Sequence, residues 1–210
     1  MELSKATKKE VVTAFRTKGI LSAARQLVGL RGLEAVTMDE IAAAAGVAKG
    51  TIYLYFRGKD NLIQTLVAQA GENILMGLET ILATALSPKD KLQQVVAMLL
   101  DHLERERVLF PIYLRDIMRG GRGGRLQELE EKFLSQLTQL FAEGIAQGQF
   151  IPADPRLFTF LVRGLVRAVG HYQMAERRED AVKEALPVLS TLIFAGLTRR
   201  SNPLEEVPPA

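Results

Sequence analysis

The 210-residue chain has no cysteine, so it can form neither a disulfide framework nor a thiolate zinc site. It also lacks any apolar run of the ~18 residues that a membrane-spanning helix needs. The N-terminal residues Met-Glu-Leu-Ser-Lys are not those of a signal peptide. We therefore expect a cytoplasmic protein with no membrane partner.

The residue patterns of the common all-helical enzymes are missing as well. A diiron bundle needs Glu-x-x-His pairs, and neither His102 nor His171 has a glutamate three residues before it. His102 and Glu106 share one helix face at i and i+4, but a single pair of this kind does not make a metal site. No serine or lysine lies in a recognisable nucleophile setting. The sequence predicts a binding protein that is not an enzyme and has no cofactor or metal.

The net charge of the chain is small, and the positive excess is unevenly distributed along the sequence. The net charge is only +3. Residues 1–64 hold ten Lys and Arg against six Asp and Glu, a net charge of +4, whereas residues 65–210 hold 17 against 18, a net charge of −1. The positive excess therefore lies in the N-terminal segment, as expected if that part alone meets a polyanion.

Glycine and proline divide the chain into helices, and no strand-like alternation occurs. Thr7 and Thr17 are both possible N-caps of the first helix, which Gly32 ends. Further helices are expected over residues 37–44, 48–55, 59–86, 88–106, 108–118, 126–147, 155–175 and 179–200.

This pattern predicts an all-α fold in two parts. Residues 1–58 form an N-terminal three-helix domain, and residues 59–200 form a larger helical domain. The Gly- and Arg-rich segment 119–125 is expected to be a solvated hinge; an anion site is the alternative, because glycine lets backbone N–H groups converge beside arginines. Residues 201–210, with three prolines, are expected to be a disordered tail.

Residues 37–59 carry the most informative pattern. Thr37-Met-Asp-Glu40 is a capping box that opens a short helix, and Gly46 supplies the turn to a second short helix. Ala42 is small enough for two helices to touch at that point. Gly50 lowers helix propensity by ~1 kcal/mol relative to alanine, which fits a helix whose backbone approaches another surface closely. This layout indicates a helix-turn-helix, whose second helix enters the major groove of DNA.

Polar side chains on the second helix support this interpretation. Tyr53 and Tyr55 carry hydroxyls that can donate to phosphate oxygens, although a half-buried core position is the alternative for one of them. Lys49 and Thr51 lie on the same short helix. Without these residues, a structural helical hairpin would be the simpler interpretation.

Residues 20–62 resemble the TetR family of bacterial transcriptional regulators. The matching residues are Ile20, Leu21, Ala23, Ala24, Leu27, Gly32, Thr37, Ile41, Ala42, Ala45, Gly46, Val47, Lys49, Gly50, Thr51, Ile52, Tyr53, Tyr55, Phe56, Lys59 and Leu62. The resemblance implies a homodimer with two N-terminal DNA-binding domains and helical bodies that bind a ligand and dimerise. The DNA contacts that it implies are Thr37, Tyr53 and Tyr55 at phosphates, Lys49 and Thr51 in the groove, and Lys59 at the DNA backbone.

Two residues depart from the family pattern. Ala48 stands where the family often has serine, which removes a hydroxyl that could cap the second helix or touch a phosphate. Ala48 and Gly50 nevertheless belong to the predicted DNA-binding surface. Gly58 stands where serine or asparagine often caps the next helix, and glycine is a tolerable substitute.

The resemblance also places a ligand pocket among the middle helices. The predicted pocket residues are His102, Phe110, Tyr113, Leu114, Ile117, Met118, Phe133, Leu137, His171 and Tyr172. The two histidines and two tyrosines each put a polar tip on an apolar surface, as a mostly apolar ligand site requires. For the aliphatic members, a plain core position is the alternative.

The resemblance also implies that the dimer interface lies on the last two long helices, and these helices carry more apolar surface than one helix face needs. The apolar residues concerned are Leu157, Phe158, Leu161, Leu165 and Val169 on one helix, and Leu186, Leu189, Ile193 and Leu197 on the other.

Tyr53-Leu-Tyr-Phe56 together with Glu143-Gly-Ile-Ala-Gln-Gly148 is similar to the fatty-acyl-CoA-responsive branch of the family. That similarity implies an apolar tunnel for an acyl chain and arginines for the phosphates. The predicted function is a ligand-responsive repressor that binds a pseudo-palindromic operator as a dimer and is released by a small, largely apolar effector. An all-α binding or adaptor protein that does not bind DNA is the alternative.

Overall fold

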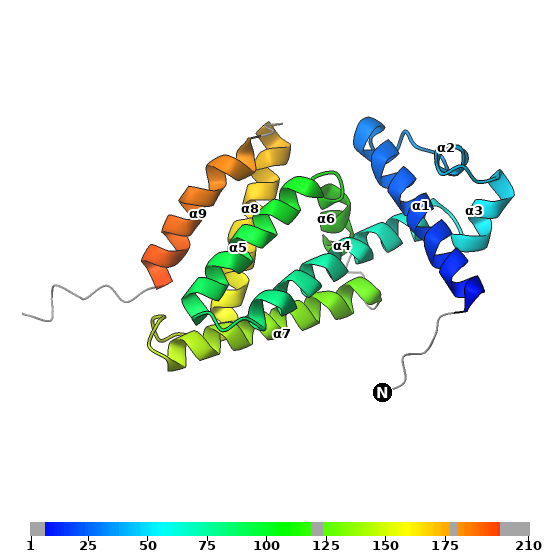
Figure 1. Ribbon diagram of the computed structural model, residues 1–210. Coiled ribbons are helices and arrows are strands. Elements are labelled where there is room, and N and C mark those ends of the chain that lie inside the picture. Colours follow the sequence, from blue (N-terminus) through cyan, green and yellow to red (C-terminus); the bar gives the residue numbers. More distant parts are fainter. Residues whose placement is uncertain (1–6, 119–123, 177–179, 198–210) are drawn as a thin grey trace, which may run out of the picture.

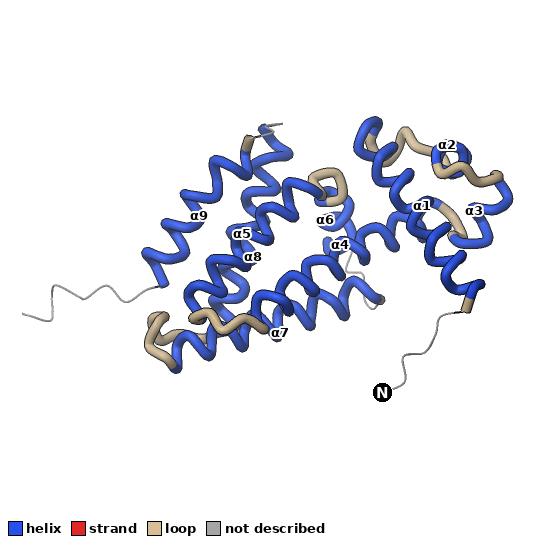
Figure 2. Tube along the Cα trace, viewed as in Figure 1, coloured by secondary structure: helices blue, strands red, loops and turns tan. Residues whose placement is uncertain are grey.

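The structure of the protein, a computed structural model, describes residues 7–118, 124–176 and 180–197. Figure 1 shows the helices of these ranges: α1 (Lys8–Arg31), α2 (Met38–Ala44), α3 (Lys49–Tyr55), α4 (Lys59–Leu82), α5 (Pro88–Arg105), α6 (Phe110–Met118), α7 (Arg125–Ala146), α8 (Pro155–Glu176) and α9 (Ala181–Leu197). The ranges just given contain no strand (Figure 2). The predicted all-α fold is confirmed.

Side chains fix the helix ends where the sequence was ambiguous. α1 begins after Thr7 rather than Thr17, because the Thr7 N–H donates to the Glu10 carboxylate at 2.7 Å in a complete capping box. α4 ends at Leu82, earlier than the expected residue 86. Its last carbonyls are satisfied by side chains: the Thr84 hydroxyl donates to Ile81 O at 2.7 Å, and Lys91 Nζ donates to Leu82 O at 2.9 Å. The chain can therefore turn early into α5.

We call α1–α3 and their connections the head and the rest of the described chain the body. The head core is formed by buried residues of α1, α2 and α3, including Ile20, Ile41 and Ile52. The same cluster continues into α4 as far as Ala70 and takes in Leu109 and Ile112. In Figure 1, α4 runs from the head along the body. A core that crosses residue 58 means that the body cannot shift at α4 without disturbing the head.

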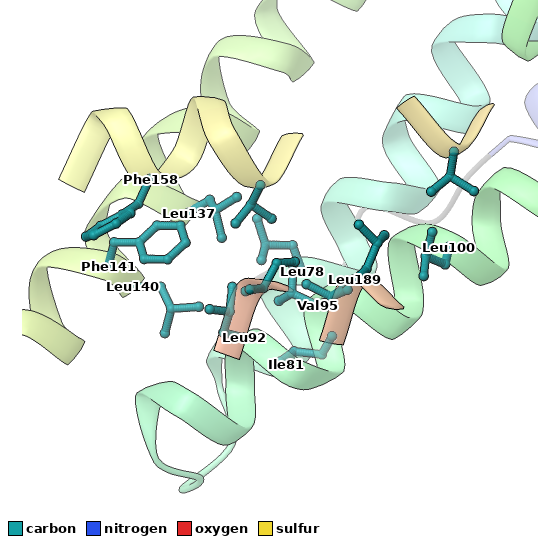
Figure 3. Close-up of a cluster of buried hydrophobic side chains, with 14 of the residues drawn as sticks. Leu78, Ile81, Leu92, Val95, Leu100, Leu137, Leu140, Phe141, Phe158 and Leu189 are labelled. Atoms are coloured by element: carbon teal, nitrogen blue, oxygen red, sulfur yellow. The ribbon is translucent and has the colours of Figure 1, made fainter. Parts of the chain in front are cut away.

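The body has a second apolar core between α4, α5, α7, α8 and α9 (Figure 3). Three phenylalanines anchor it, with ring centroids 5.7 Å apart for Phe141–Phe150 and 5.5 Å apart for Phe141–Phe158. Gly144 makes room for them, because a Cβ there would lie 2.2 Å from the Phe150 ring. Close packing of this kind makes the centre of the body rigid.

Parts of three predictions fall outside the described residues. These are the hinge, of which residues 119–123 are not described, the tail over 201–210, and the end of the last helix. Within the described chain, no helix is long and apolar enough to cross a membrane. The same residues contain no group of three or more His, Asp or Glu that could hold a metal ion.

Candidate nucleic-acid interface and ligand cavity

The capping box at the start of α2 is formed as expected. The Thr37 N–H and hydroxyl donate to Glu40 Oε2 at 2.8 and 2.9 Å, and the Glu40 N–H donates back to Thr37 Oγ1 at 3.3 Å. Arg31 donates to the other oxygen of Glu40 at 2.7 Å. These contacts, the one from Arg31 first and those from Thr37 next, lower the pKa of Glu40 to about 2. Thr37 is exposed, but its hydroxyl is engaged by the protein's own carboxylate.

α3 presents a short exposed surface on the side of the head away from the body (Figure 1). Ile52 is fully buried and holds the helix against the head core. Lys49, Gly50 and Tyr53 are exposed, whereas Thr51 and Tyr55 are half-buried. Tyr55 packs against the head core, which is the half-buried position that the sequence offered as the alternative for one of the two tyrosines.

The protein's own packing does not require glycine at position 50. A Cβ on Gly50 would meet no atom within 4 Å, and its φ is not in the left-handed region. Gly46, by contrast, takes a φ of 66° in the turn before α3, where a side chain would be strained. The absence of an internal reason for Gly50 supports a close approach by an external surface.

The two residues that depart from the family pattern both lie at helix starts. Ala48 is the N-cap of α3 and makes no side-chain hydrogen bond to it. Gly58 likewise begins α4 without a side-chain cap. The Asn61 Oδ1 accepts from the Arg57 N–H at 3.2 Å and steadies this junction. Lys59 lies half-buried in the first turn of α4.

Lys49 is paired across the turn with α2. Its Nζ lies 2.6 Å from Asp39 Oδ2, and this hydrogen bond is the first cause of a raised pKa of Lys49. Both side chains are largely exposed, at 72% and 52%. An exposed pair of this kind is weak and screened by salt, so a DNA phosphate can compete with Asp39 for the lysine.

A cavity of about 160 Å³ lies among α4, α5, α6, α7 and α8. Most of its wall is apolar; the residues that line it are Val67, Ala70, Gly71, Ile74, Leu99, His102, Leu103, Glu106, Leu109, Phe110, Tyr113, Leu126, Leu129, Glu130, Phe133, Arg163, Val166 and Arg167. An apolar cavity with a few convergent polar groups is the usual form of a small-molecule site.

Four predicted pocket residues line this cavity: His102, Phe110, Tyr113 and Phe133. Leu137, one turn beyond Phe133 on α7, does not, because it is fully buried in the body core. Leu114 is half-buried and is not part of the wall. Ile117 and Met118 belong to α6, but their side chains lie outside the described part of the chain.

His171 and Tyr172 lie outside the cavity, on exposed positions of α8. The ring of Phe110 closes the cavity against Gly170, where a Cβ would come within 2.4 Å of Phe110 Cζ. His171 packs edge-on against that ring, with centroids 5.8 Å apart. His171 therefore contacts the cavity wall from outside the cavity.

Charged residues supply the polar part of the wall, and the sequence interpretation missed them. Glu130 accepts hydrogen bonds from Arg163 and, at 3.1 Å, from Arg167. Arg167 also donates to the Tyr113 hydroxyl at 2.7 Å and lies over its ring, 5.4 Å from the centroid. One signal was available: Arg163 and Arg167 are spaced i, i+4 within an otherwise apolar stripe.

At the head end of the cavity, His102 lies in the last turn of α5, and Glu106 follows directly after the end of that helix. Burial, and after it the charge of Arg25, lowers the pKa of His102, which favours the neutral imidazole. Glu106 forms an ion pair with Arg25 of α1. The cavity wall is thus connected to the head by a side-chain contact as well as by α4.

The predicted interface residues on α8 and α9 divide into two groups. Leu157, Leu161 and Leu186 are exposed, whereas Phe158, Val169, Leu189 and Ile193 are buried within the body core. Leu165 is partly buried, and the side chain of Leu197 lies outside the described part of the chain. Further exposed apolar residues on these two helices, which the sequence did not single out, include Phe160, Val188 and Leu192.

Two models of known protein families match this chain. A sequence model described as "Bacterial regulatory proteins, tetR family" matches residues 20–66. A second, described as "Tetracyclin repressor-like, C-terminal domain", matches residues 85–171. The first covers the helix-turn-helix and the start of α4, and the second covers most of the helices around the cavity.

Three relatives are informative. A fatty acid metabolism regulator protein of Bacillus subtilis (strain 168) is 25% identical over 83% of this chain and 92% of its own length. The HTH-type transcriptional repressor KstR2 of Mycolicibacterium smegmatis is 26% identical over 66% of this chain and 69% of its own. The crystal structure of the transcriptional regulator FadR from Bacillus subtilis in complex with stearoyl-CoA has a TM-score of 0.66 at 26% identity, and covers 84% of this chain and 97% of that one.

These regulators act by binding DNA and are not enzymes. The motif in the head, the cavity in the body and the two matching sequence models lead to one assignment. The chain belongs to the TetR family of bacterial transcriptional regulators.

Proposed function

We propose that this protein is a repressor that binds a pseudo-palindromic operator as a homodimer and releases it when a fatty acyl-CoA enters the cavity. The proposal depends mainly on one observation: residues of α4 and of the segment before α6 belong both to the cavity wall and to the head core. Val67, Ala70 and Leu109 line the cavity and also belong to the buried core of the head. A ligand that moves these residues must therefore disturb the head.

The size of the cavity supports a mechanism in which binding forces helices apart. A volume of about 160 Å³ compares with the ~150 Å³ void that holds benzene in a protein core, and ligand pockets usually measure ~300–1,000 Å³. A long acyl chain fits only after α4 and α7 separate. They meet at Gly71, where a Cβ would touch Leu126 and Leu129 at 3.4 Å. A near-complete switch needs the ligand to favour the DNA-incompetent state by ~10⁴ in affinity.

The chemistry of the wall supports an acyl-CoA. Its apolar part suits a hydrocarbon chain. Its polar part includes Arg163 and Arg167, and the Nε of Arg167 is buried with no hydrogen-bond partner in the described chain. That N–H suits an acceptor such as a thioester carbonyl or a phosphate oxygen. The relatives named for fatty acid metabolism and for stearoyl-CoA point to the same class.

α8 and α9 supply the proposed dimer surface. Their exposed apolar residues include Leu157, Phe160, Leu161, Leu186, Val188 and Leu192. Figure 1 shows the two helices packed together at the end of the body away from the head. A monomer rarely exposes this many large apolar side chains on two adjacent helices, so a second copy is the proposed cover.

Operator release tests the proposal directly. Fluorescence anisotropy measures binding to a labelled operator during titration with acyl-CoAs of increasing chain length, and calorimetry measures acyl-CoA binding alone. Arg167→Met should weaken acyl-CoA binding on the order of tenfold, since a charge-assisted hydrogen bond is lost. Arg156→Met, on the exposed start of the same helix, is the matched control and should bind as wild type.

Two results would contradict the proposal. If no acyl-CoA gives heat or releases the operator, the effector class is wrong. If affinity for every duplex offered is indifferent to salt, DNA binding itself is wrong, because phosphate neutralisation makes affinity fall steeply with ionic strength. The second result would favour the alternative function, an adaptor protein that does not bind DNA.

A further inference from the structure

Glu106 lies where the cavity meets the head. Its backbone N–H, just after the end of α5, donates to His102 O at 2.9 Å, and its side chain lines the cavity. One carboxylate oxygen, Oε1, accepts a hydrogen bond from Arg25 of α1. The side chain is only 11% exposed, and its Oε2 is buried without a hydrogen-bond partner in the described chain. Glu106, a residue that lines the cavity, therefore forms an ion pair with the head through one carboxylate oxygen and has a second oxygen without a partner in the described chain.

The segment that follows Glu106 is built into the head. Val108 packs 3.8 Å from where a Cβ on Gly29 would lie, and Leu109 and Ile112 belong to the head core. A second ion pair between body and head, Arg115 with Glu34, spans 3.7 Å, and Glu34 is 89% exposed. Such an exposed pair contributes little. The Arg25–Glu106 pair is the more buried of the two and the one that a ligand can reach.

We propose that Glu106 selects ligands that carry a hydroxyl or amide N–H, and that the ligand weakens the Arg25–Glu106 pair and so loosens α1 from the body. This inference rests on the proposed ligand cavity and deepens it by naming the ligand group that is recognised and the contact that transmits binding. An acyl-CoA satisfies the requirement, because its pantetheine arm carries two amide N–H groups and one hydroxyl.

The physical basis is competition for one carboxylate. A ligand donor at Oε2 shares the negative charge that holds Arg25, and Arg25 is 33% exposed, so its guanidinium can return to water. A ligand without a donor instead covers an unpaired carboxylate oxygen with hydrocarbon, which is unfavourable. Ligands of equal size therefore differ in affinity according to whether they can donate a hydrogen bond.

Two isomeric probes test this without DNA or an acyl-CoA. 1-Octanol and heptyl methyl ether have the same atoms, but only the alcohol donates a hydrogen bond. Calorimetry should give tighter binding of 1-octanol to the wild-type protein, by about fivefold or more, within the range of typical coupling effects. Hydrogen exchange of residues 20–31 in α1 should accelerate several-fold with 1-octanol and stay unchanged with the ether.

Variants decide which contact carries the effect. In Arg25→Gln, α1 should exchange fast without any probe, and 1-octanol should add nothing although it still binds. Arg25→Lys keeps the cation and should restore the wild-type response, which guards against a folding defect. Glu34→Gln removes the other head–body pair and should respond as wild type.

The inference is overturned if the two isomers bind equally, if 1-octanol does not bind, or if Arg25→Gln still responds to bound 1-octanol. Failure of the proposed function is a separate result, since it is measured as loss of operator binding or of release by acyl-CoA.

Discussion

In the head, the side chains that carry the predicted function are exposed or half-buried at the surface; in the body, they are largely enclosed. Lys49 is 72% exposed, whereas Arg163, Glu130 and Arg167 at the cavity are 17%, 20% and 25% exposed. The head meets a polyanion of fixed shape, so exposed donors at fixed spacing are sufficient. The body must exclude water around a flexible ligand, so its charged groups have to satisfy one another until the ligand arrives.

The largest expected effect lies in the head. Lys49→Ala should weaken operator binding on the order of tenfold per head, because a charge-assisted contact to DNA is lost. If Lys49 contacts a phosphate, the slope of log affinity against log salt should fall by about 1 per head. If it contacts a base edge, the slope should stay and sequence preference should relax. Anisotropy titrations at several salt concentrations distinguish the two, and unchanged affinity would contradict the assignment of α3.

Glycine substitutions sharpen the comparison, because the two regions use glycine for different reasons. Gly144→Ala should destabilise the protein by about 1–3 kcal/mol, the usual cost of overpacking a core, since the added Cβ would lie 2.2 Å from the enclosed Phe150 ring. Urea unfolding measures this change. A Gly144→Ala variant as stable as wild type would show that the Phe150 ring can shift to accept the added Cβ without loss of stability.

Gly50→Ala is the opposite case in the head. Nothing lies within 4 Å of the added Cβ, so stability should rise by up to ~1 kcal/mol through helix propensity. Operator affinity should nevertheless fall, because the methyl group separates the α3 backbone from the DNA. A variant that gains stability and keeps full affinity would remove the functional explanation for this glycine.

The same contrast explains how far the sequence could predict each region. The head is specified by short-range rules: the Thr37–Glu40 capping box spans three residues, and Gly46 needs its positive φ because of the turn beside it. The cavity is assembled from residues 67 to 167. Its ion pairs join residues 33 to 81 positions apart in the chain, as in Arg163–Glu130 and Arg25–Glu106.

Polarity alone therefore does not separate the residues that line this cavity from those that lie outside it. His102 and Tyr113 were found because a polar tip stands out in an apolar stripe. Glu106, Glu130 and the two arginines were missed because a charged residue on a helix normally indicates the solvent face. His171 was predicted for the same reason as His102, yet the ring of Phe110 separates it from the cavity.

Substitution of Asp39 should change operator affinity less than substitution of Lys49 does, and in the opposite direction. It holds Lys49 at 2.6 Å in the structure, so operator binding requires the lysine to exchange one anion for another. Asp39→Asn frees Lys49 and removes a negative charge near the phosphates, and it should raise operator affinity by up to about fivefold at low salt, with less gain at high salt. Asp60→Asn, an exposed change at the start of α4, controls for net charge and should produce a smaller gain.

The smallest predicted effect is a pH dependence within the head. The pKa of Glu40 is lowered from 4.5 to about 2, so its ionised form stabilises the fold. That contribution is complete above pH 4.5 and is lost as the pH falls towards 2. Glu40→Gln removes the charge but keeps a residue that can form a capping box. Its melting temperature should lie below that of wild type at neutral pH, and the difference should close between pH 4.5 and 2.

Arg31→Gln should reproduce most of this difference, because the hydrogen bond from Arg31 is the largest cause of the lowered pKa of Glu40. Added salt should reduce the gap between wild type and both variants, since the Arg31–Glu40 pair is exposed. Thermal melts across this pH range would contradict the assignment if the gap persisted at pH 2, because a neutral Glu40 can no longer attract Arg31. A persistent gap would mean that side-chain packing, and not charge, holds the start of α2 in place.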